Sequence, residues 1–135
     1  MTGGGLFTRS PTMAMNSRLT IRELEKRWEN VLSITRTAVA RNPGVYHQLK
    51  ALAGDIVERP LDISEYLPTA EKLVGLLKIM DPDGGGSIFS FFNDRISPSC
   101  IWHVPLLRME CKDLLAHLKA FDQWRIDTRH LKLMK

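Results

Sequence analysis

Two cysteines and two histidines lie close enough in the sequence to suggest metal chemistry. Cys100 and His103 are separated by two residues, which is an acceptable spacing for half of a zinc site. Cys111 and His117 are six residues apart in a helical pattern, so their side chains point to different faces. Cys111 also belongs to an apolar stripe, where an unpaired cysteine commonly serves as a small hydrophobic residue. The spacing therefore argues against a zinc site made of these four residues.

An acidic, glycine-rich turn with the sequence DPDGGGS begins at Asp81 and separates two apolar segments. The residues from Leu73 to Met80 are almost all apolar, which predicts a buried helix that ends at the Asp81-Pro82 pair. The carboxylates of Asp81 and Asp83 supply oxygen atoms of the kind that Ca²⁺ prefers. An ordinary structural turn between two buried segments is the alternative interpretation.

The twelve residues that begin at Asp81 resemble the calcium loop of an EF-hand. Asp81 and Asp83 stand at positions 1 and 3 of that loop, Gly86 stands at the sharp turn of position 6, and Ser87 offers its carbonyl at position 7. The pattern departs at position 12, where Phe92 replaces the bidentate glutamate. The resemblance implies an EF-hand-like turn with Asp81, Asp83 and Ser87 as its ligands and at most weak calcium binding. No other cofactor is expected.

Composition places the chain among compact globular proteins. Its 135 residues are 44% hydrophobic and 25% charged, which fits one domain with its own core. Two cysteines in this length do not indicate a secreted disulfide scaffold, so a reducing intracellular compartment is expected. The sequence contains no P-loop, dinucleotide fingerprint or nucleophile elbow, and we therefore expect a protein that is not an enzyme.

The chain is predicted to consist of a flexible N-terminal arm, residues 1–17, and a single helical domain, residues 18–135. The arm is rich in Gly, Ser, Thr and Met and has no acidic residue. A mitochondrial transit segment has a similar composition, so this targeting stays open as an alternative. No apolar run is long enough to span a membrane.

Local start signals predict the first two helices. Thr20 and Glu23 have the spacing of a capping box, which predicts a helix from Thr20 to about Arg41. Asn42 and Pro43 are typical of an N-cap followed by the first helical residue, and they predict the start of a second helix.

Further breaks predict the remaining helices. Asp62 is expected to begin a single helical turn, and Pro68 to begin the buried helix that leads to Asp81. Pro105 is expected to begin a later helix, and the chain is predicted to end in a basic helix from Asp122 onwards. The sequence thus predicts an all-α protein, a small bundle of five or six helices.

Apolar residues follow a 4-3-4-3 spacing after Pro105 and form one helical stripe, which we call the seam. Spacing alone leaves open whether the seam faces the chain's own bundle or another protein. We predict it as a partner surface made of Leu107, Cys111, Leu114, Leu118 and Phe121.

Net charge is +4, from 19 basic and 15 acidic residues, and both ends of the chain are basic. This excess supports an alternative function in which basic residues contact nucleic-acid phosphates. The candidate residues are Arg18, Arg22, Lys26, Arg36, Arg41 and Lys50.

The main functional prediction is a non-enzymatic, helical protein-interaction subunit of a larger assembly, whose partner is another protein chain. The alternative is a basic helical protein that binds RNA or DNA through the phosphate backbone. Acidic residues interleaved with the basic ones favour the first hypothesis. The oligomeric state stays open.

Overall fold

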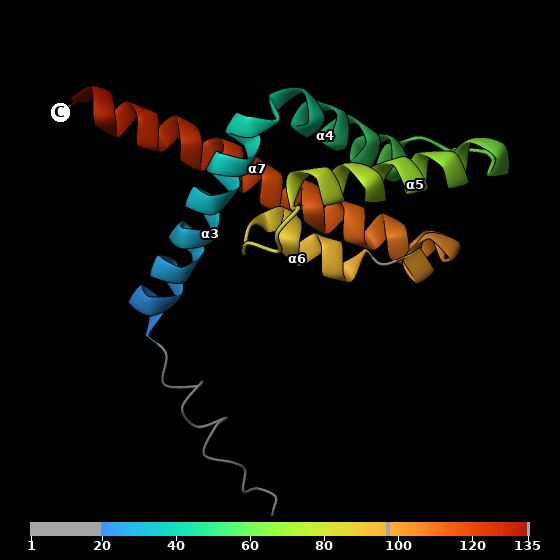
Figure 1. Cartoon of the computed structure of the whole chain (residues 1–135), viewed down its shortest axis with the longest axis horizontal. Coiled ribbons are helices and arrows are strands. Elements are labelled where there is room, and N and C mark those ends of the chain that lie inside the picture. Colours follow the sequence, from blue (N-terminus) through green and yellow to red (C-terminus); the bar gives the residue numbers. More distant parts are fainter. Residues whose placement is uncertain (1–19, 97, 135) are drawn as a thin grey trace, which may run out of the picture. The chain divides into compact units, whose positions relative to one another are not determined.

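The structure is a computed structural model that describes residues 20–96 and 98–134, except for the side chains of residues 99 and 130–134. The described residues form helices joined by short turns and contain no strand (Figure 1). The predicted all-α fold is therefore confirmed. The predicted arm, residues 1–17, and the candidate Arg18 lie outside the described residues.

Five α-helices and one short 3-10 helix make up this part of the chain, in agreement with the predicted five or six. In chain order they are α3 (Ile21–Arg41), α4 (Pro43–Glu58), α5 (Ile63–Met80), α6 (Ile88–Arg95), the 3-10 helix η1 (Pro98–Trp102) and α7 (Val104–Met134).

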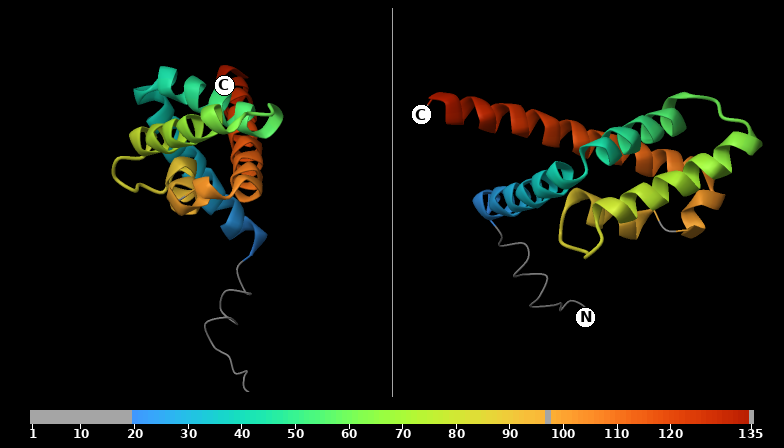
Figure 2. Two further views of the ribbon diagram at one scale, coloured as in Figure 1. Left: turned by 90° about the vertical axis from the view of Figure 1, so that its right-hand side faces the viewer. Right: turned by 45° about the horizontal axis from the view of Figure 1, so that its top comes forward.

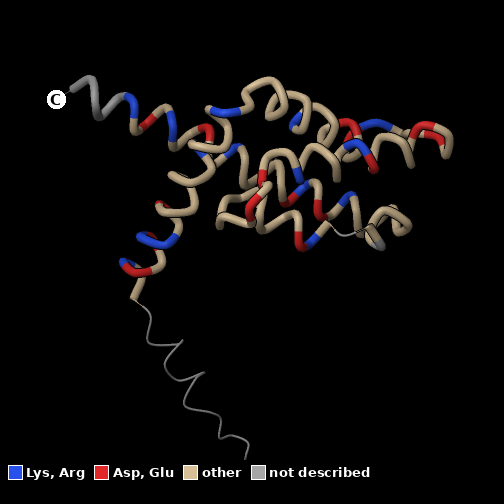
Figure 3. Tube along the Cα trace, viewed as in Figure 1, with Lys and Arg blue, Asp and Glu red and all other residues tan. Residues whose placement is uncertain are grey.

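Backbone contacts divide the chain into two units, and the division falls within α3. The first unit ends at Asn30 and the second runs from Val31 to the end of the chain. In the first unit the predicted capping box is confirmed. The Glu23 N–H donates to Thr20 Oγ1 at 3.1 Å, and the Thr20 N–H donates to Glu23 Oε1 at 3.2 Å. Acidic and basic residues are interleaved along these first turns of α3 (Figure 3).

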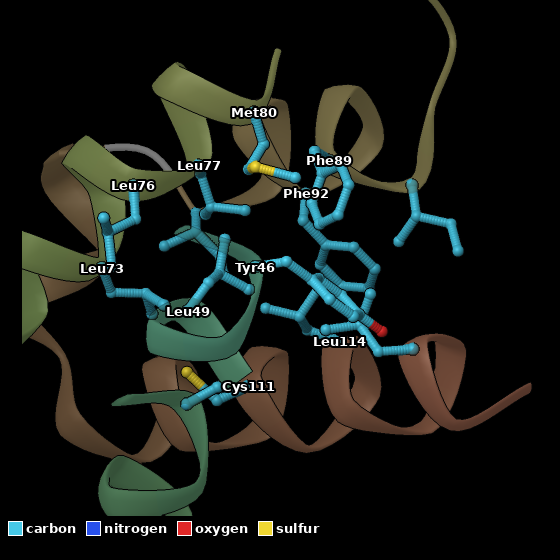
Figure 4. Packing of buried hydrophobic residues seen from close by; sticks show 14 of the residues in the cluster. Tyr46, Leu49, Leu73, Leu76, Leu77, Met80, Phe89, Phe92, Cys111 and Leu114 are labelled. Atoms are coloured by element: carbon cyan, nitrogen blue, oxygen red, sulfur yellow. The ribbon is translucent and has the colours of Figure 1, made fainter. Parts of the chain in front are cut away.

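The hydrophobic core of the second unit lies between four helices. Helix α4 packs against α5 and α7, and α6 also packs against both α5 and α7. Figures 1 and 2 show α7 continuing beyond α5 and α6 at its C-terminal end. Side chains from all four helices interdigitate in the close-up view, among them Tyr46, Leu49, Leu73, Leu77, Phe89, Phe92 and Leu114 (Figure 4).

A buried hydroxyl joins the second half of α3 to the start of α6. Thr35 is fully buried on α3, and its Oγ1 accepts a hydrogen bond from the Ile88 N–H at 2.9 Å. The same hydroxyl donates to the Val31 carbonyl one turn earlier at 2.8 Å. Thr35 therefore satisfies a backbone donor at the first residue of α6 that would otherwise be buried without a partner.

Helix α5 begins earlier than the sequence predicts. It starts at Ile63 and continues through Pro68, so the prediction that a separate helix begins at Pro68 is wrong. The Asp62 side chain accepts from the Glu65 N–H at 3.0 Å and caps the first turn. Pro68 is inside the helix and disfavours it, because proline has no backbone N–H to donate. The half-buried Tyr66 and Leu67 just before it pack against the core.

Helix α7 is also longer than predicted. It begins at Val104, one residue before the predicted Pro105, because His103 Nδ1 accepts a hydrogen bond from the Leu106 N–H at 3.1 Å. It passes Asp122 without a break, so the predicted terminal helix is the second half of α7.

Candidate functional site

The turn between α5 and α6 is closed by its own side chains. Asp81 Oδ1 accepts hydrogen bonds from the Gly85 N–H at 3.0 Å and from the Ser90 hydroxyl at 2.7 Å. Ser87 Oγ accepts from the Ser90 N–H, Ser90 Oγ accepts from the Ser87 N–H, and both distances are 3.1 Å. The two serines therefore cap α6 reciprocally, and Asp81 fixes the cap to the end of α5.

The three predicted calcium ligands line one shallow hollow together with the positively charged side chain of Arg41. Asp81, Asp83 and Ser87 line a space of about 250 Å³ together with Arg41. A guanidinium at this place opposes the binding of a second cation. Phe92, at the position of the missing glutamate, is fully buried in the core. No group of three or more His, Cys, Asp or Glu side chains in the described residues could hold a metal ion. Calcium binding by this turn stays a prediction.

The seam is not a partner surface. Its five residues are fully buried in the chain's own core, where α7 packs against α4 and α6, which corrects the prediction for Leu107, Cys111, Leu114, Leu118 and Phe121. A ring contact shows that the seam faces α4, because Phe121 lies edge-on to Tyr46 of α4 with their centroids 5.9 Å apart. The spacing correctly identified a buried stripe, but the opposing surface belongs to this chain.

The predicted phosphate-binding residues of the second unit have three different environments. In the second unit, Lys50 pairs with Asp122 at 2.6 Å, Arg36 lies over the Trp124 ring at 4.9 Å, and Arg41 lines the hollow at the turn. Arg22 and Lys26 are exposed on the first turns of α3. Binding of nucleic acid through all of these residues stays a prediction.

Asp122 is the centre of a polar cluster that joins α4 to α7. Its carboxylate accepts from the Tyr46 hydroxyl at 2.8 Å, from Lys50 Nζ at 2.6 Å and from the Arg125 guanidinium at 2.8 Å. Burial by itself would raise the pKa of Asp122, but the three hydrogen bonds outweigh it and lower the pKa below its ordinary value. Sequence reasoning missed this cluster because Tyr46 and Asp122 are 76 residues apart.

The cysteines and histidines singled out in the sequence have structural positions. Cys100 and Cys111 are buried and not bonded to each other, and burial raises the pKa of the Cys111 thiol to about 12. A thiol with so high a pKa stays protonated at neutral pH and is a poor nucleophile. His103 caps α7, and His117 lies edge-on to Phe92 at 5.3 Å between centroids.

An exposed apolar depression, which we call the apolar hollow, lies where α4 and η1 end and where α5 and α7 begin. It has a volume of about 400 Å³, and its lining includes Ile63, Tyr66, Leu67, Trp102 and Val104. Two of these side chains are strongly exposed, Ile63 at 92% and Trp102 at 75%. Exposed tryptophan beside exposed aliphatic residues is typical of interaction surfaces.

Two arginines line the apolar hollow. Arg59 is already paired with Glu65 at 3.1 Å and Asp55 at 3.7 Å. Arg108 donates from Nε to the Ile56 carbonyl at 3.1 Å and makes no ion pair with the residues that the structure describes. Arg108 therefore gives the lining of this site a cation that has no ion-pair partner among the described residues. Sequence reasoning missed the hollow because Ile63 and Trp102 stand at helix ends, where no periodic pattern marks them.

No protein-family model, curated protein or solved structure matches the chain. None of the helices in the described part of the chain combines the length and the apolarity that crossing a bilayer requires.

Proposed function

We propose that this chain is a non-enzymatic interaction subunit and that it binds an apolar segment of a partner protein in the apolar hollow. The observation that supports this proposal is the exposure of Trp102 and Ile63 around a concave apolar site. Interface energy is concentrated in a few aromatic and aliphatic side chains that lose their water contact on binding.

The charge of the hollow favours an acidic partner segment. Arg108 makes no ion pair among the described residues, and it lines the site. A carboxylate placed there would gain a charge-assisted hydrogen bond, whereas a lysine would be repelled. The volume of about 400 Å³ suits a few side chains of an amphipathic helix better than a whole domain.

A panel of labelled helical peptides tests the proposal. Each peptide carries leucines four residues apart, flanked either by glutamates or by lysines, and binding is measured by fluorescence anisotropy. We expect the glutamate peptides to bind, and we expect Trp102→Ala to weaken that binding roughly 30-fold or more.

Ile79→Ala is the matched control, because Ile79 is an exposed apolar residue on α5 outside the hollow. Arg108→Gln should reduce the preference for glutamate over lysine. The proposal fails if Trp102→Ala and Ile79→Ala bind the peptides equally well. Self-association that Trp102→Ala abolishes would instead make a second copy of this chain the occupant.

A further inference from the structure

A second concave site, which we call the arginine hollow, lies between α3, α4 and α7 within the unit of residues 31–135. It has a volume of about 770 Å³. Its cationic lining comes from Arg36, Arg125 and Arg129, and its apolar lining includes Val39, Pro43 and Ile126. The arginine hollow shares no lining residue with the apolar hollow. It combines three guanidinium groups with an apolar surface.

Two of the three arginines are held in place by aromatic rings. The Arg36 guanidinium lies over the Trp124 ring at 4.9 Å, and the Arg125 guanidinium lies over the Phe121 ring at 4.7 Å. Stacking restrains a guanidinium while its in-plane N–H groups remain able to donate. Arg129 lies one helical turn beyond Arg125 on the same helix. Little side-chain freedom is therefore lost when Arg36 and Arg125 bind a ligand.

The hollow carries an excess of positive charge. Asp122 is the one acidic residue in the described lining, and its carboxylate is already engaged by Tyr46, Lys50 and Arg125. Helix α4 begins at Pro43 in the same lining, and no side-chain hydrogen bond caps it there. The positive end of the α4 dipole adds to the field of the arginines.

We propose that the arginine hollow binds a small organic phosphate. Guanidinium groups match the oxygens of a phosphate through paired hydrogen bonds, and three of them line this site. The apolar residues of the lining would take the organic part of the ligand. The volume falls in the range of small-molecule sites. A nucleic-acid backbone, in contrast, is bound along an extended row of cations and gains little from an apolar lining.

Isothermal titration calorimetry tests the proposal. The full chain is titrated separately with 1-naphthyl phosphate, inorganic phosphate and 1-naphthol. We expect 1-naphthyl phosphate to bind with a Kd of about 0.1–1 mM and the other two compounds to bind at least roughly tenfold more weakly. Arg129→Gln and Arg36→Gln should each weaken 1-naphthyl phosphate about tenfold or more, since each removes charge-assisted hydrogen bonds.

Lys72→Gln is the matched control, because it removes one positive charge from an exposed position on α5 that is outside the hollow. Circular dichroism of every variant confirms that it is folded. The proposal is overturned if Lys72→Gln weakens binding as much as Arg129→Gln does. It is equally overturned if inorganic phosphate binds as tightly as 1-naphthyl phosphate, or if a short duplex binds and competes with 1-naphthyl phosphate through the same arginines.

Discussion

Replacing Thr35 with valine removes one hydroxyl from a fully buried position and keeps the shape of the side chain. In the native chain this hydroxyl accepts from the Ile88 N–H at 2.9 Å, and Ile88 is itself almost fully buried. Water cannot replace the lost acceptor without opening the contact between α3 and α6. Thr35→Val therefore leaves a backbone donor unsatisfied in the core.

An unsatisfied buried donor lowers the free energy of unfolding by about 1–3 kcal/mol. Thr35→Ser is the matched variant, because it keeps the hydroxyl and removes only a methyl group, at about 1 kcal/mol. The two substitutions therefore separate the hydrogen bond from the packing. If the hydrogen bond dominates, the valine variant is the less stable of the two.

Urea unfolding measures both free energies, and amide hydrogen exchange reports the Ile88 N–H directly. We expect the Ile88 amide to lose protection in Thr35→Val and to retain it in Thr35→Ser. A valine variant as stable as the native chain, with Ile88 still protected, would refute the reasoning. It would mean that the N–H finds another acceptor or that α6 is not held by α3.

Two further predictions concern the carboxylates of Asp122 and Asp81. Asp122→Asn should destabilise the chain by roughly 1–3 kcal/mol at neutral pH. Because the pKa of Asp122 is lowered in the folded state, its stabilising effect is complete above its unfolded pKa of about 4 and is lost as the pH falls through the folded value. Urea unfolding at pH 7 and pH 3 should therefore show the difference between Asp122→Asn and the native chain shrinking at the lower pH, and an undiminished difference would contradict this. Asp81→Ala should lower the melting temperature in the presence of chelator, because Asp81 accepts hydrogen bonds from Gly85 and Ser90. If calcium raises the melting temperature of the native chain but not that of Asp81→Ala, the turn also binds the ion.

Two helix caps between residues three apart were predictable from the sequence. The capping box of Thr20 and Glu23 and the cap at Asp62 are both present, because each joins residues of a single turn and needs no distant partner. The predicted break at Pro68 fails for the opposite reason. The helix continues through Pro68, although proline disfavours it, because its start is capped and the residues before Pro68 are partly buried against the core.

Both candidate binding sites needed the tertiary structure. Ile63 and Trp102 line one hollow only because the ends of α4 and η1 meet the starts of α5 and α7 at one place. Arg36 and Arg129 are similarly brought to one hollow from α3 and α7. Neither pair has a spacing in the sequence that could have marked it.

Local patterns in the sequence were enough to predict a helical chain, the start of several helices and the apolar stripe of α7, because these properties depend on neighbours within one or two turns. What that stripe faces depends on how distant helices pack. The seam from Leu107 to Phe121 could have met a partner, but it is buried against α4 and α6 of the same chain. Trp102 is instead strongly exposed, and the proposed partner site lies around it, since exposure depends on how distant helices pack and not on the spacing of residues along one of them.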